Sequence, residues 1–340
     1  MSAIVECVPN FSEGRDRETI TRIGASIRAV PGATLLSVEP DRDYNRTVVT
    51  FVGTPQVVVE AAFSATKTAA ACIDMRRHTG EHPRIGATDV VPFVPVAGVT
   101  MEECVALAKQ YGQRVGEELK IPVYLYEEAA TRPERRNLST IRKGEYEGLA
   151  EKLKDPVWVP DFGPAVMNES SGATVTGARF FLVAYNVNLG TDDPKIAQEI
   201  ALRIRESGRL KKNAAGEPVL DDAGRKVMIP GTLPAVKAMG VLLEAHNIAQ
   251  VSINLVNFTV TPPHIAFEEV KRQAATLGVA VTGSEIVGLT PLEALRMAGA
   301  FYAPGVTDEK RLLDIAVEQL GLSQLDRFDP ARKIIEYQLS

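Results

Sequence analysis

The order of secondary-structure elements constrains the fold of this chain more than any other feature, because the same order is predicted twice. In the first half, a strand, a helix, two strands, a helix and a strand follow one another. The first helix carries Ile20, Ile23 and Ile27 on one face, and the second is an alanine-rich segment that begins at Pro55, a residue suited to the first helical position. The predicted strands lie at residues 4–8, 34–38, 47–52 and 90–94. A further helix, with a capping box at Thr100 and Glu103, and a strand at residues 123–126 extend this half.

The second half repeats the order without obvious residue identity. Its helices begin at Pro194 and Pro263, and the second ends at Gly278, where a left-handed cap favours glycine. The predicted strands lie at residues 180–187, 236–243, 250–258 and 279–281. A βαββαβ order is the split βαβ arrangement of ferredoxin-like folds. The sequence therefore predicts an α/β (α+β) protein with two ferredoxin-like subdomains.

Three segments fall outside this repeat. Residues 127–178 are rich in proline, glycine and charge and have weak periodicity, so we expect an ordered ligand-binding loop there. Residues 208–232 are predicted to form a solvent-exposed hairpin, and the chain from about Thr307 is predicted to be a helix with a charged tail. The expected division is an N-terminal subdomain at 1–178, a C-terminal subdomain at 179–305, and a helix and tail at 306–340.

Composition favours a small-molecule partner. The formal net charge is −5, and no run of lysine and arginine marks a surface for nucleic acid or membrane. The start of the chain lacks the pattern of a signal peptide, and no segment is apolar over the ~18 residues of a membrane span, so a cytoplasmic protein is expected. Cys7, Cys72 and Cys104 are odd in number and far apart, which favours buried thiols over disulfides or a paired-cysteine metal site.

One of only four histidines, His82, lies in the stretch Gly80-Glu81-His82-Pro83-Arg84. Pro83 disfavours a helical conformation at the residue before it, so His82 is expected on a bend that can point into a cleft. An imidazole titrates near neutral pH and can carry a proton between two reacting atoms. His82 is therefore the first candidate for the catalytic residue. Arg46 comes at the start of a predicted strand and could hold a substrate carboxylate through its two-pronged guanidinium.

A zinc hydrolase is an alternative, because His78, Glu81 and His82 match the H-x-x-E-H pattern of an inverted zinc-peptidase motif. That chemistry needs both imidazoles on one regular helix. Gly80 within the motif and Pro83 after it disfavour such a helix, and no third metal ligand follows in a recognisable motif.

Several stretches together resemble the glutamate formiminotransferases, the transferase half of formiminotransferase-cyclodeaminase. They are Val5–Gly14, Asn45-Arg46-Thr47, His78–Gly86, Pro160–Pro164, Ala184–Leu189, Gln250–Leu255 and Val287-Gly288-Leu289. The resemblance spans residues from about 3 to 305. It implies transfer of the formimino group from N-formimino-L-glutamate to nitrogen 5 of tetrahydrofolate, in histidine degradation and one-carbon metabolism. It also implies two α/β subdomains whose sheets face each other in a sandwich around a ligand tunnel, a homodimer, tetrahydrofolate as co-substrate and no metal.

Carried over by residue, the resemblance implies that His82 is the catalytic proton relay. It also implies a set of substrate-binding residues, with the folate contacts in the loop from Gly163 to Gly172. This set is Asn10, Glu39, Arg46, Glu81, Arg84, Gly163, Pro164, Ala165, Val166, Met167, Asn168, Glu169, Ser170, Ser171 and Gly172. Glu39 stands where animal members have aspartate, which leaves a non-catalytic folate-binding protein as a further alternative. The cyclodeaminase step is expected in another polypeptide.

Overall fold

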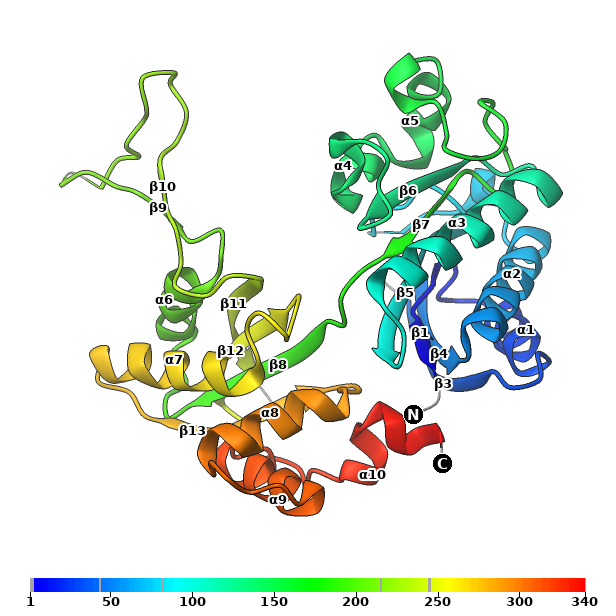
Figure 1. Ribbon diagram of the computed structural model, residues 1–340. Helices are drawn as coiled ribbons and strands as arrows, with labels where there is room; N and C mark the ends of the chain where they lie inside the picture. Colours follow the sequence, from blue (N-terminus) through cyan, green and yellow to red (C-terminus); the bar gives the residue numbers. More distant parts are fainter. Residues whose placement is uncertain (1–2, 43, 81, 215, 244–245, 340) are drawn as a thin grey trace. The chain divides into compact units, whose positions relative to one another are not determined.

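The computed structural model describes residues 3–339 apart from 43, 81, 215 and 244–245 (Figure 1). The chain divides into two compact units, residues 1–180 and 181–340. Both units contain helices and strands, which confirms the predicted α/β (α+β) class. Whether the two sheets face each other stays a prediction. In the described part of the chain, none of the helices combines the length and the apolar character that a membrane crossing requires.

The first unit is built on the predicted βαββαβ order. Its elements are β1 (Ile4–Cys7), α1 (Arg17–Arg28), β3 (Thr34–Asp41), β4 (Arg46–Gly53), α2 (Pro55–Cys72) and β5 (Thr88–Ala97). The strands lie in the order β3-β4-β1-β5, and each neighbouring pair is antiparallel. The short strand β2 (Asn10–Phe11) pairs with β4 and β5 beyond the end of β1. This is the strand arrangement of a ferredoxin-like fold.

Two parallel strands extend this sheet. β7 (Thr174–Ala178) pairs with β5 on one side and with β6 (Val123–Glu127) on the other. The helix α3 (Met101–Glu118) precedes β6, and the predicted capping box between Thr100 and Glu103 is present at its start. Helices α1, α2 and α3 cover one face of the sheet, where Val5, Phe51 and Phe93 pack into the main core.

The expectation of a long loop at residues 127–178 is wrong. This segment contains the short helices η2 (Pro133–Arg135), α4 (Leu138–Arg142), α5 (Glu145–Lys152) and η3 (Pro156–Trp158) as well as β7. Ile141 and Leu149 are fully buried and pack with Tyr124 and Val175 in a second, smaller core. The helices α4 and α5 therefore cover part of the sheet face opposite α1 to α3. Helices this short contain too few turns for an apolar periodicity to be recognised.

The second unit repeats the topology. Its elements are β8 (Val183–Leu189), α6 (Pro194–Ile204), β11 (Val236–Leu243), β12 (Ile248–Leu255), α7 (Pro263–Thr276) and β13 (Val281–Val287). The antiparallel order β11-β12-β8-β13 corresponds to β3-β4-β1-β5 of the first unit. The predicted hairpin is present as an excursion that contains β9 (Arg209–Leu210) and β10 (Met228–Ile229), and it projects from its own unit (Figure 1).

Two predictions for the second unit need correction, and one helix was missed. The strand expected at residues 279–281 is β13, which begins only at Val281, because Gly278 turns the chain with a φ of 73°. The helix α8 (Leu292–Tyr302) was not predicted. After α9 (Glu309–Gln319), the expected charged tail instead folds into α10 (Pro330–Lys333) and η4 (Ile335–Leu339). Ile334 and Ile335 are fully buried, and the burial of these two apolar side chains holds the segment against the rest of its unit.

The two units differ in their connections. In the first unit residues 73–87 join α2 to β5, whereas in the second only residues 277–280 join the corresponding elements α7 and β13. The connection between the first helix and the second strand shows the opposite difference. It is long in the second unit, where residues 205–235 join α6 to β11, and short in the first, where residues 29–33 join α1 to β3. The long connection of the first unit carries His82.

Candidate active site

His82 lies on the α2–β5 connection, outside any regular element. This connection starts with the turn η1 (Met75–Arg77), and the described residues from His78 to Gly80 and at His82 are not helical. Gly80 is required, because a Cβ there would meet the Tyr44 carbonyl oxygen at 2.4 Å. The connection is therefore docked closely against the turn before β4. Glu81, a predicted substrate-binding residue, lies outside the described residues.

Arg46, the first residue of β4, contacts the imidazole of His82. Its Nη1 donates to Nε2 of His82 at 2.7 Å. A guanidinium can only donate, so Nε2 accepts with its lone pair and the imidazole is neutral. Burial, together with the positive charges of Arg46 and Arg142, lowers the pKa of His82 to about 4. At neutral pH His82 is thus a proton acceptor whose lone pair faces a guanidinium.

These side chains line a narrow crevice. Its walls are formed by Ser12, Tyr44, Asn45, Arg46, His78, His82, Arg84 and Asp89, and its interior leaves no free space for a water molecule. The ring of Tyr44 lies 5.9 Å from that of His82, centroid to centroid. One hydrogen-bond donor of Arg46 is unused, because its buried Nε has no hydrogen-bond partner among the described residues.

The strand register places other predicted residues on the same sheet face as Arg46. Asp41 of β3 is paired with Arg46, and Glu39 is paired with Val48, which in turn is paired with Asn10 of β2. Residues two apart on a strand point to the same face, so Asn10 and Glu39 share the face of Arg46. This face is opposite the main core. Glu39 is exposed, and Asn10 is half-buried and donates to the Val8 carbonyl at 3.3 Å.

Asp89 and Arg142 are site residues that the sequence did not reveal. Asp89 is buried at the start of β5, where it accepts from the backbone N–H of Ile85 at 2.9 Å and from the guanidinium of Arg142 on α4. Burial raises the pKa of Asp89, and Arg142 opposes this rise. The pair brings the charge of Arg142 close to His82. No local pattern links these residues, since they are 53 positions apart.

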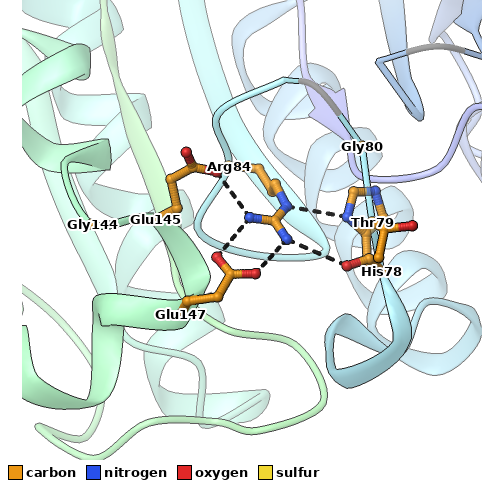
Figure 2. Close-up of a pocket in the computed structure, with 7 residues that line it drawn as sticks. All are labelled: His78, Thr79, Gly80, Arg84, Gly144, Glu145 and Glu147. Atoms are coloured by element: carbon orange, nitrogen blue, oxygen red, sulfur yellow. Dashed lines mark hydrogen bonds and ion pairs between the residues drawn. The ribbon is translucent and has the colours of Figure 1, made fainter.

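Arg84 is buried and holds two carboxylates (Figure 2). It donates to Glu145 at 2.9 Å and through both terminal nitrogens to Glu147, at 2.8 and 2.7 Å. Its Nε donates to Nδ1 of His78 at 3.2 Å. These residues line an open hollow of about 450 Å³ next to the crevice. A substrate carboxylate could reach Arg84 only by displacing Glu145 or Glu147.

The geometry of the described residues does not favour the zinc alternative. His78 accepts from Arg84 at Nδ1, and its Nε2 contacts the carbonyl oxygen of Asn45 at 2.9 Å, so both ring nitrogens are used. His82 turns Nε2 toward a cation. Nowhere in the described part of the chain do three or more His, Cys, Asp or Glu side chains gather closely enough to hold a metal ion.

The predicted folate loop, Gly163 to Gly172, is fixed at both ends. Gly163 has a φ of 81° and packs against the Ile121 carbonyl, and Gly172 has a φ of 68° and packs against that of Ile85. The Ser171 carbonyl accepts from the N–H of Ala87, so the end of this loop adjoins the end of the His82 connection.

Within the loop, Asn168 accepts from Ser170 and Ser171, which folds this part back on itself. Tyr146 donates to the Glu169 carbonyl at 2.5 Å, and Met167 packs against the second core. Ala165 and Val166 are exposed, Val166 by 70%, and Pro164 is half-buried. Ala165 and Val166 thus form an exposed apolar part of the loop.

Two family models together match nearly the whole chain. The model described as the formiminotransferase domain, N-terminal subdomain, matches residues 4–179, and the model described as the formiminotransferase domain matches residues 184–340. The formimidoyltransferase-cyclodeaminases of Rattus norvegicus and Dictyostelium discoideum are 51% and 50% identical over 99% of this chain. The chain spans 60% of the length of each of these two relatives.

Shorter relatives align over most of their own length. The glutamate formimidoyltransferase of Streptococcus pyogenes serotype M1 is 46% identical over 89% of this chain and 94% of its own. That of Thermoplasma acidophilum is 45% identical over 93% of this chain and 98% of its own. Among solved structures, a chain of complex III from Candida albicans covers 93% of this chain and 85% of its own with 8% identity and a TM-score of 0.18, which is too low to indicate a shared fold.

Proposed function

The chain belongs to the formiminotransferase family, and we propose that it is a glutamate formimidoyltransferase. The proposed reaction moves the formimino group of N-formimino-L-glutamate to nitrogen 5 of tetrahydrofolate. The names of the relatives from Streptococcus pyogenes and Thermoplasma acidophilum support this activity. The observation that carries the proposal is the neutral imidazole of His82, whose Nε2 lone pair is held 2.7 Å from Arg46.

His82 serves as the proton carrier in the proposed reaction. Nitrogen 5 of tetrahydrofolate attacks the formimino carbon and forms a new C–N bond, and His82 Nε2 takes the proton that nitrogen 5 loses. The bond between that carbon and the glutamate nitrogen then breaks, and His82 returns the proton to the departing amine. A positioned base of this kind accelerates such a transfer by about 10²- to 10⁴-fold.

Arg46 binds a substrate carboxylate in this proposal. Both substrates carry glutamate carboxylates, and a carboxylate oxygen is a stronger acceptor for a guanidinium than a neutral imidazole is. The contact would draw Arg46 away from His82 and uncover Nε2. Because Arg46 also lowers the pKa of His82, neutralising its charge would make the imidazole a better base. Glu39, on the same face, is proposed to contact the positively charged formimino group.

The remaining assignments rest on the family resemblance. Tetrahydrofolate is the proposed co-substrate, without a metal ion, and the loop from Gly163 to Gly172 is the proposed folate-binding segment. The division into subdomains 1–178 and 179–305, a cytoplasmic location and a homodimer are further parts of the proposal. Asn10 and Glu81 are proposed to contact substrate. Arg84, which was expected to bind substrate, is instead proposed to have a structural role, because its donors are engaged by Glu145, Glu147 and His78.

A direct assay tests the proposal. Purified protein is given formiminoglutamate and tetrahydrofolate, and the formation of 5-formiminotetrahydrofolate and free glutamate is followed with and without a chelator. Equal amounts of both products, insensitive to the chelator, are expected. Folate binding without turnover would favour the non-catalytic alternative, and chelator-sensitive hydrolysis would favour the zinc hydrolase.

A further inference from the structure

A chain of polar contacts leads from the surface of the first unit to His82. It begins at Glu147, an exposed residue that grips the guanidinium of Arg84 with both carboxylate oxygens (Figure 2). Such a two-pronged contact fixes the plane of the guanidinium. The side chain of Arg84 is only 7% exposed, so its third nitrogen, Nε, has a defined direction, toward His78.

Arg84 selects the tautomer of His78. Because Nε of Arg84 donates to Nδ1 at 3.2 Å, Nδ1 carries no hydrogen, and the proton of the neutral ring is on Nε2. That proton is donated to the carbonyl oxygen of Asn45 at 2.9 Å. Burial lowers the pKa of His78, and the charge of Arg84 also lowers it. His78 is thus a neutral side chain held rigidly between a guanidinium and a backbone carbonyl.

The carbonyl that His78 holds belongs to the peptide plane shared by Asn45 and Arg46. This plane is rigid, so a hydrogen bond to its oxygen orients the backbone from which the Arg46 side chain leaves. Asn45 itself has a φ of 47°, and its side chain accepts from Gly14 and donates to the carbonyl of Thr79, each at 2.9 Å. His78 and the side chain of Asn45 thus join the two segments that carry His82 and Arg46.

We propose that His78 is a positioning residue for the transfer reaction, which orients the Asn45–Arg46 peptide so that the Arg46 guanidinium faces His82 Nε2. Arg84 and Glu147 support it by keeping the proton of His78 on Nε2. None of these three side chains needs to touch a substrate. The kinetic consequence rests on the proposed function, whereas the structural consequence at His82 does not.

Two substitutions of His78 distinguish the effect of losing its hydrogen bond to the Asn45 carbonyl from the effect of losing the volume of its ring. In His78→Gln the amide nitrogen can take the place of Nε2 and still donate to Asn45. In His78→Asn the shorter amide can face Arg84 but cannot reach the Asn45 carbonyl. We expect His78→Asn to lower kcat by about 10- to 100-fold, because a misplaced Arg46 would hold the substrate carboxylate in the wrong position relative to His82, and His78→Gln to stay within about threefold of the wild type. Arg76→Gln, on the same connection but outside these contacts, is the control.

The titration of His82 provides a readout that does not need catalysis. The charged and titratable groups that act on it are Arg46, Arg142, Asp41 and Tyr44, and a hydrogen bond to the Pro83 backbone also contributes. With four histidines in the chain, the ¹⁵N-histidine NMR signals can be assigned by single substitutions. We expect the pKa of His82 to rise above about 4 in His78→Asn, because Arg46 moves away while the burial remains, and to stay low in His78→Gln.

Glu147→Gln is a second variant, at an exposed position that tolerates change, and it should shift the His82 titration in the same direction by a smaller amount. An unchanged His82 titration in both His78→Asn and Glu147→Gln, or an equal loss of kcat in both His78 variants, would overturn the positioning role. If the His82 titration shifts in His78→Asn but the wild type transfers no formimino group, the positioning role is supported and only the proposed function is overturned.

Discussion

The contact between Arg46 and His82 is the residue-scale feature on which the proposed chemistry depends. Replacement of His82 by alanine removes the proton carrier and leaves the sheet and the loop at Gly163 to Gly172 in place. We expect turnover in a formimino-transfer assay to fall more than ~100-fold, while the dissociation constant for folinate changes little. The exposed His246→Ala variant is the matched control and should keep full turnover. Comparable turnover in the two variants would remove His82 from the mechanism.

A second prediction at the residue scale concerns Glu6 and the dependence of stability on pH. Glu6 is 5% exposed in the middle of β1, on the face opposite Val5 and Cys7, and burial raises its pKa from 4.5 to about 7, against the opposing charge of Arg179. Between these two pH values the folded chain binds a proton that the unfolded chain does not. The free energy of unfolding therefore carries a contribution that falls as the pH rises from 4.5 to about 7.

Glu6→Gln removes this titration. We expect its stability relative to the wild type to improve by about 1–3 kcal/mol between pH 5 and pH 8, measured by urea denaturation at both pH values. Glu102→Gln, at an exposed position on α3, should show no such pH-dependent gain. A constant difference between Glu6→Gln and the wild type across this range would show that Glu6 ionises as freely when folded as when unfolded.

The sequence predicts His82 and Arg46 as candidate site residues because their signals are local. Pro83 forces a bend at His82, and Arg46 begins a β-prone run. The partners of Arg84 could not be predicted in the same way, because Glu145 and Glu147 are 61 and 63 positions away. The sequence assigns His78 a role only in the zinc alternative, whereas the structure places it between Arg84 and Asn45. Contacts of this kind depend on which elements meet, and no spacing within the chain encodes them.

At the scale of elements, a buried ion pair ties the start of the proposed folate loop to β6. Asp161 accepts from the N–H of Leu125 at 2.8 Å and from Arg135 at 2.7 Å, and the Arg135 and Asp161 side chains are only 2% and 9% exposed. Asp161→Asn would leave a buried guanidinium without its counter-charge. We expect a loss of about 3–5 kcal/mol in the free energy of unfolding, measured with urea.

The control for this prediction is Glu128→Gln, which breaks the pair with Arg136, a side chain that is 63% exposed. An exposed pair contributes at most about 1 kcal/mol, so the two variants should differ clearly. Equal, small losses in both would mean that water reaches Arg135 once Asp161 is changed.

Strands and helices with strong periodicity were predicted at their places, and the βαββαβ order follows from them. Most of the missed elements were missed for the same physical reason: packing, not a repeating sequence pattern, decides their conformation. The helices α4 and α5 have 5 and 8 residues, so packing against Tyr124 and Val175 rather than a repeating pattern decides their form. The segments α10 and η4 are likewise set by what they pack against, as the buried Ile334 and Ile335 illustrate, whereas α8, with 11 residues, is long enough to show a pattern and was missed.

At the scale of the whole molecule, each unit has the parts of an independent folding domain. The second unit closes its own antiparallel sheet, and Tyr185, Ile200 and Val251 are fully buried. We expect the fragment 181–340 to fold on its own, with a cooperative urea transition and a circular dichroism spectrum of mixed helix and strand. It should show no transferase activity, because it lacks His82. A fragment that is unfolded, while 1–180 is folded, would mean that the second unit depends on the first.

Two copies of one topology in a single chain are what duplication and fusion of an ancestral gene would produce. The strand and helix framework is the same in both copies, but the segment between the second helix and the last strand is long in one, at residues 73–87, and short in the other, at 277–280. Lengthening that segment disturbs none of the strand pairing around it. The first unit could therefore acquire reactive side chains on its long connection while the second unit kept a short one. Substitutions in this connection would leave the strand pairing of both units intact.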